Sequence, residues 1–136
     1  MKRLPLLTWV IGLIVTATIA NAAGSDNFAG EFADKNYLNG QAVVQASIEQ
    51  AGNSVSIFFT GGRKDGQGCA PEINATGTAT NGTVRFKFLD SEKNSGTGTI
   101  SRAGDGILVS IKPMKVADAR CLGFYRENMR LQRVRK

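Results

Sequence analysis

The sequence contains no histidine, and this absence narrows the chemistry that the protein can perform. Without histidine, no Ser–His or Cys–His nucleophile pair can form, and acid–base catalysis would depend on carboxylates, lysine or tyrosine. The only loosely neighbouring acids are Asp90 with Glu92 and Asp118 with Glu127, and neither pair lies in an apolar stretch that would tune a catalytic carboxylate. We therefore expect no catalytic residues, with a carboxylate-based activity as the remaining alternative.

Metal ligands and cysteines are equally scarce. The chain has no CxxC pair and no DxDxDG-like run, so we expect no metal site and no cofactor. Its two cysteines, Cys69 and Cys121, form an even pair, which predicts one disulfide in an oxidising compartment. A half-complete metal site is the alternative interpretation of this pair.

The first 22 residues have the pattern of a secretory signal peptide. Lys2 and Arg3 precede an apolar stretch, and Ala20-Asn21-Ala22 supplies the small residues that signal peptidase requires. A membrane anchor is the alternative, but the apolar run is shorter than the roughly 20 residues that span a bilayer. We expect a signal peptide at 1–22, a single domain at 23–136, and a periplasmic or secreted location without a transmembrane segment.

Positive charge is concentrated near the C-terminus. Loss of Lys2 and Arg3 would lower the formal net charge from +6 to +4. The C-terminal stretch accounts for this whole excess, because it has a single acid, Glu127, and five cations: Arg126, Arg130, Arg133, Arg135 and Lys136. A local basic stretch differs from the broad basic face typical of nucleic-acid binders. Phe58 is the one outward aromatic expected near the middle of a strand, so we expect no nucleic-acid partner.

Between these ends, apolar residues alternate with polar ones, and turn residues interrupt the alternation at short intervals. Asn81-Gly82 is a strong hairpin signal, because both central residues of that turn need positive φ. The fold class predicted is all-β, a single antiparallel barrel or barrel-like sandwich of about eight strands. The small inward residues Ala42, Ala46, Ala75, Gly77 and Ala79 favour a narrow interior. The segment 113–122 is ambiguous, with one helical turn as an option. The expected strands are 28–32, 41–50, 54–60, 72–80, 83–89, 96–101, 107–112 and 123–134.

The first strand, Phe28-Ala29-Gly30-Glu31-Phe32, resembles the start of calycin and avidin barrels, in which Gly-x-Trp begins the first strand. Here Phe32 stands in place of the Trp. The resemblance implies that a basic residue of the last strand, Arg130 or Arg133, packs across that end of the barrel. In size, export and single disulfide the chain also resembles the small periplasmic lysozyme inhibitors, with Ser95-Gly96 as the counterpart of their inhibitory loop.

These patterns predict an exported binding module that contacts a macromolecular partner through rim loops, with inhibition of an envelope or secreted enzyme as one such role. The disulfide would bring the glycine-rich loop 61–68 beside 113–120, so the expected partner-binding residues are Arg63, Lys64, Lys115 and Arg120. One alternative is a calycin-type carrier with a small ligand inside the barrel. Another is an envelope component that binds anionic surface polymers through a basic last strand with Arg126, Arg130, Arg135 and Lys136. Asn74 and Asn81 match the N-glycosylation pattern, which has consequences only in a eukaryotic host.

Overall fold

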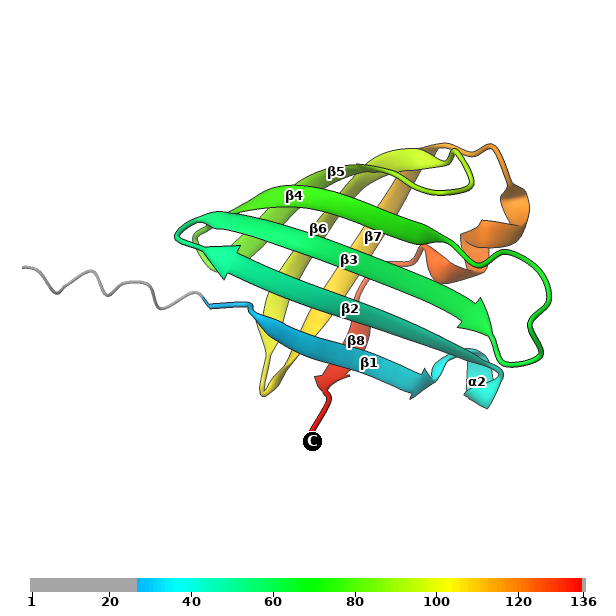
Figure 1. Ribbon diagram of the computed structural model, residues 1–136, viewed down its shortest axis with the longest axis horizontal. Helices are drawn as coiled ribbons and strands as arrows, with labels where there is room; N and C mark the ends of the chain where they lie inside the picture. The colour runs from blue at the N-terminus through cyan, green and yellow to red at the C-terminus, as the bar shows by residue number, and fades with distance from the viewer. Residues whose placement is uncertain (1–26, 136) are drawn as a thin grey trace, which may run out of the picture.

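The chain folds into a closed barrel of antiparallel strands (Figure 1). The structure is a computed structural model that describes residues 27–135, so the predicted signal segment 1–22 and Lys136 lie outside the described residues. Each strand pairs with its neighbour in sequence, and β1 pairs with β8 through Phe32 and Arg133 to close the sheet. The barrel prediction is confirmed, and the sandwich alternative is wrong. The strands are β1 (Gly30–Asn36), β2 (Ala42–Ala51), β3 (Ser54–Arg63), β4 (Glu72–Thr80), β5 (Thr83–Leu89), β6 (Ser95–Ala103), β7 (Gly106–Lys115) and β8 (Met129–Arg133).

Turn chemistry accounts for the hairpins. Asn81 and Gly82 have φ angles of 54° and 78°, so the β4–β5 turn has the left-handed backbone that its sequence predicts. The β1–β2 connection is an irregular turn, α2 (Tyr37–Gly40), in which Leu38 and Asn39 also have positive φ. Within residues 27–135, no helix is long and apolar enough to cross a bilayer.

The last strand is shorter than predicted. The structure has a 3₁₀ helix, η3 (Ala119–Phe124), followed by an irregular stretch, and β8 begins only at Met129. Asn128 has a φ of 58°, which interrupts the extended backbone immediately before β8. Tyr125, Met129 and Leu131 are nevertheless buried, as the sequence pattern predicts.

The barrel interior is filled by its own side chains. Aromatic rings occupy the space that inward-facing glycines leave open: a Cβ added to Gly61 would lie 2.6 Å from Cδ1 of Phe124. Likewise, a Cβ on Gly98 would lie 2.7 Å from Cε2 of Phe86. The side chains that are largest and most fully buried include Phe28, Phe32, Phe59, Ile73, Ile100, Ile107, Ile111 and Leu131.

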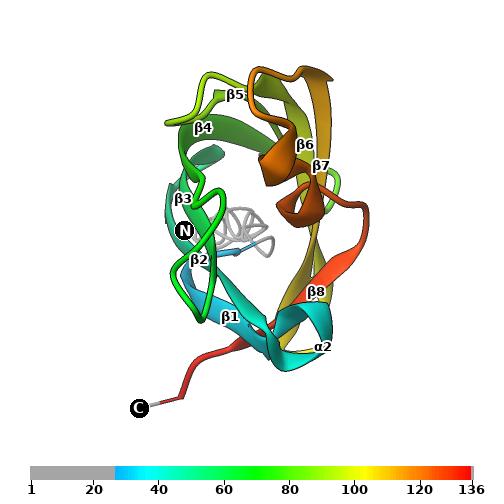
Figure 2. The ribbon, with the colours of Figure 1, turned by 90° about the vertical axis from the view of Figure 1, so that its right-hand side faces the viewer.

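The two ends of the barrel differ. At the end that Figure 2 views, η3 lies over the opening, and Tyr37 stacks on Phe124 with ring centroids 5.9 Å apart. At the other end, the guanidinium of Arg133 lies 4.8 Å from the ring centroid of Phe32. Of the two cations that the calycin resemblance suggests, Arg133 therefore occupies the expected place. The described chain shares the eight-stranded antiparallel architecture of that plan.

Candidate functional site

One disulfide joins the two segments that the sequence predicts to meet. Cys69 lies in the loop after β3 and Cys121 lies in η3, and their Cα atoms are 5.1 Å apart. The loop is also held by its backbone, because the amide of Gly61 donates to the carbonyl of Pro71 and the amide of Lys64 donates to that of Gln41. We call this end of the barrel the disulfide rim; it comprises the loop 64–71, the turn 90–94, the segment 113–124 and the strand ends Arg63 and Leu89.

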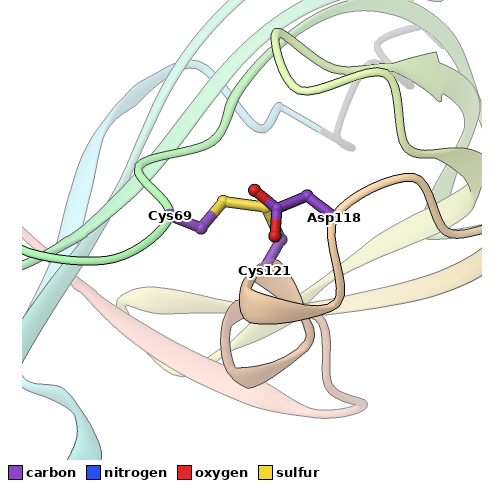
Figure 3. A group of neighbouring side chains, drawn as sticks. All are labelled: Cys69, Asp118 and Cys121. Carbon is purple, nitrogen blue, oxygen red and sulfur yellow. A yellow bond between two sulfur atoms is a disulfide. The ribbon is translucent and has the colours of Figure 1, made fainter.

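Asp118 lies beside the disulfide, with its carboxylate directed toward the bridge (Figure 3). Its carboxylate oxygens accept hydrogen bonds from the backbone amide, Nε and Nη2 of Arg120, at 3.0, 3.0 and 2.8 Å. These hydrogen bonds to Arg120 hold the pKa of Asp118 below its usual value. Cys69, Asp118 and Cys121 are close enough to suggest a metal site, but both sulfur atoms belong to the disulfide and cannot act as thiolates. The cluster instead stabilises the start of η3, where Asp118 is the N-cap.

A buried polar network fixes the turn 90–94 to the rest of the rim. The carboxylate of Asp90 accepts hydrogen bonds from the amides of Glu92 and Asn94, from the Asn94 side chain and from the Tyr125 hydroxyl. Asn94 Oδ1 in turn accepts from the amides of Ala117 and Asp118, at 2.7 and 2.9 Å. Burial raises the pKa of the Tyr125 phenol, so this group remains a donor. Sequence analysis missed this network because its parts are far apart in the chain.

The four predicted rim cations lie at one end of the barrel but do not form one patch. Arg63 lies at the end of β3 and Lys115 at the end of β7, and these strands are on opposite sides of the closed sheet. Arg63 donates to Gln41 Oε1 at 3.1 Å and lies 3.7 Å from Asp65, while Arg120 is bound to Asp118. Lys64 and Lys115 are exposed, and neither has an ion-pair partner among residues 27–135.

Exposed apolar side chains also gather at this end, and the sequence-based site prediction missed them. They are Leu89, Met114, Val116 and Leu122, whose exposed fractions range from 42% to 74%. Met114 lies where the β6–β7 register shifts, which places an extra residue in β7 between Pro113 and Lys115. One sequence feature could have indicated these exposed side chains: the alternation in β5 places Leu89 on the outer face. A second feature was Pro113, because the regular pairing of β6 with β7 is interrupted immediately after it.

The predicted basic strand face is divided in the structure. Arg126 precedes β8 and lies over the ring of Tyr37, 5.8 Å from its centroid. Arg130 is exposed on β8, whereas Arg133 and Arg135 share the carboxylate of Asp105 at 3.3 and 2.7 Å. Two of the described cations are thus engaged by one acid, and the C-terminal strand presents no uniform row of free charge.

Comparison with known proteins gives no relative to guide the interpretation of these surfaces. No family model, no curated protein and no solved structure matches the chain.

Proposed function

We propose that the protein is an exported, non-catalytic binding module that contacts a macromolecular partner through the disulfide rim. The observation that carries this proposal is the combination, at one end of the barrel, of exposed apolar side chains with free lysines. Leu89 and Met114 are 67% and 74% exposed, and Lys115 follows Met114 directly. Apolar patches edged by polar groups are typical of protein interaction sites, and methionine is enriched in such interfaces.

The rim has the rigidity that such a site needs. The disulfide holds Cys69 to Cys121, and the Asp90–Asn94–Tyr125 network holds the turn 90–94 against the segment that carries Val116. A segment that is already ordered loses less conformational entropy when a partner binds. A modest apolar contact with the rim can therefore give measurable affinity, because little of its binding free energy is offset by ordering of the rim.

The charge of the rim indicates the kind of partner. Lys64, Lys93 and Lys115 are exposed and have no ion pair among the described residues. Of the rim acids, Asp65 and Asp118 face the arginines next to them, Asp90 is buried, and Glu92 is half-buried. Free lysines at the edge of an interface accelerate association with an acidic surface and slow association with a cationic one. The exposed lysines thus favour an acidic enzyme or envelope protein as the partner over a cationic lysozyme. Inhibition of such an enzyme is one outcome of binding.

The carrier hypothesis receives less support from the interior. Phe86 and Phe124 occupy the space beside Gly98 and Gly61, and a ligand between the strands would have to displace such rings. The proposal therefore places the binding site on the surface of the barrel.

The test begins with capture of partners from an envelope extract by the oxidised protein, followed by measurement of binding kinetics. The variant Leu89→Ser/Met114→Ser should raise the dissociation rate about tenfold or more. Lys64→Ser/Lys115→Ser should slow association at low salt, with a smaller effect at high salt. Phe58→Ser is the matched control, because Phe58 is exposed on the outer face of β3, and its binding should not change.

Equal binding by all three variants would exclude the rim as the contact surface. A small molecule found enclosed by Val44, Ile57, Phe86 and Val109 would instead establish the carrier function.

A further inference from the structure

The outer face of β5, β6 and β7 carries a second charged surface that is distinct from the disulfide rim. Pairing aligns Lys87 with Thr97 and Thr97 with Lys112, and the adjacent row aligns Arg85, Thr99 and Ser110. From Ser95 to Ser101, the outward positions of the central strand, β6, all carry hydroxyl side chains: Ser95, Thr97, Thr99 and Ser101. Long cationic side chains on β5 and β7 therefore flank a track of short hydroxyl residues.

This difference in side-chain length hollows the surface on both sides of β6. One hollow, of about 490 Å³, extends from Thr97, Gly98 and Thr99 of β6 across Arg85 and Lys87 of β5 to Thr76, Gly77 and Thr78 of β4. A second, of about 250 Å³, combines the same three β6 residues with Ser110, Lys112 and Glu127 of the opposite side. The two hollows share Thr97, Gly98 and Thr99, and together they run across β4 to β7; we call them the cationic trough.

The polar groups of the trough are available to a ligand. Among residues 27–135, the side chains of Arg85, Lys87 and Lys112 have no ion pair. The hydroxyls of Thr97 and Thr99 likewise have no hydrogen-bond partner within that range. Glu127 is the one acid that lines the trough, at the β7 edge. Three unpaired cations around a hydroxyl floor form a surface complementary to an anionic polymer.

We propose that the cationic trough binds a linear acidic polysaccharide that lies across β4, β5, β6 and β7. The trough crosses four strands that lie about 4.8 Å apart, so it extends over about 14 Å and accommodates a few sugar units. Acid groups of the polymer pair with Arg85 and Lys87 on one side and with Lys112 on the other. The sugar hydroxyls exchange hydrogen bonds with Thr97 and Thr99.

The structure favours this occupant over an acidic peptide or a nucleic acid. The barrel is closed, so β5, β6 and β7 offer no free edge to which a peptide could add as a strand. The outward positions of these strands carry no aromatic ring on which nucleobases could stack. Recognition must therefore come from charge and hydroxyl groups, which an acidic polysaccharide matches along its whole length.

The experiment measures binding of a fluorescent polyuronate oligosaccharide to the disulfide-bonded protein, purified after expression of the full chain. Uncharged dextran of equal size is the negative probe, and polyglutamate and single-stranded DNA are the competing polyanions. Arg85→Gln/Lys87→Gln/Lys112→Gln should weaken polyuronate binding by about tenfold or more. The matched control, Lys35→Gln/Arg102→Gln/Arg130→Gln, removes the same charge from exposed positions outside the trough and the disulfide rim, and should change binding by less than about threefold.

Two further variants separate the trough from diffuse charge. Thr97→Val/Thr99→Val keeps side-chain shape but removes the hydroxyls, so it should weaken polyuronate binding and leave polyglutamate binding unchanged. Glu127→Gln removes the acid at the edge and should strengthen polyuronate binding. Equal losses of polyuronate binding in the trough triple and in the control triple, or tighter binding of polyglutamate or DNA than of polyuronate, would overturn the proposal.

Discussion

Gly98 offers a direct test of the claim that the barrel interior is filled. It lies on β6 opposite Phe86, and it faces inward. A Cβ at this position would lie 2.7 and 2.8 Å from the ring carbons Cε2 and Cε1 of Phe86, which is closer than real Cβ contacts allow. Phe86 is only 5% exposed, so its ring has little room to move aside.

The expected magnitude follows from two opposing effects. Gly98 does not have a positive φ, so Gly98→Ala by itself would stabilise the fold by about 0.4–1 kcal/mol through the unfolded chain. Overpacking in a filled core costs about 1–3 kcal/mol, which is the larger effect. We therefore expect a net loss of about 1–2 kcal/mol in the free energy of unfolding, measured by denaturant titration.

The control is Gly62→Ala, which also lies on a strand, β3, and also lacks a positive φ. No atom would lie within 4 Å of its added Cβ, so this variant should be neutral or slightly stabilised. Phe86→Leu should relieve the clash, so the double variant should be more stable than the sum of the single changes by about 1 kcal/mol. If the Gly98→Ala and Gly62→Ala variants are equally stable, the barrel interior can accommodate additional atoms. That result would support the hypothesis of a small-ligand carrier.

Two other predictions concern the disulfide rim. Cys69→Ser/Cys121→Ser opens a link between residues 52 positions apart and should lower the free energy of unfolding by about 4 kcal/mol in the chain-entropy model; a loss below about 1 kcal/mol in denaturant titration would contradict this. Since the folded-state pKa of Asp118 is lowered, its contribution to stability is present above the unfolded pKa of about 3.9 and is lost as the pH falls through the folded pKa. Below about pH 4, η3 should therefore loosen in the wild type, and the protection of the Cys121 amide from hydrogen exchange should fall. Asp118→Asn should remove this pH dependence. The same response to acid in both proteins would refute the role of Asp118.

Local sequence signals predicted the fold well where the structure depends on neighbouring residues. The β4–β5 hairpin follows from Asn81-Gly82, and the inward face of each strand follows from period-two alternation. The predicted start of the last strand, at residue 123, was wrong, because the alternation from Tyr125 onward continues through a segment whose backbone is not extended. Only the positive φ of Asn128 and the pairing of Met129 with Val109 show where β8 begins.

The rim was predicted only in part because its organisation depends on contacts between distant segments. The Cys69–Cys121 pairing was the simplest outcome for two cysteines, and it is confirmed. Asp90 belongs to a run of polar residues that is typical of an exposed turn, yet it is 6% exposed. Its burial depends on the Tyr125 hydroxyl, which lies 35 positions further along the chain. No local pattern in the turn 90–94 indicates that partner.

The cationic trough depends on register as well as on pattern. Alternation alone places Lys87 and Lys112 on the outer faces of their strands, and nothing in the sequence aligns them with the same residue of β6. The pairing of Thr97 with both lysines creates that alignment, and a slip of one residue would turn one set of side chains into the barrel. The phenylalanines that fill the interior resist such a slip, because their rings would then face water. Core packing thus holds the outer cations in place, so the proposed trough depends on residues of the barrel interior.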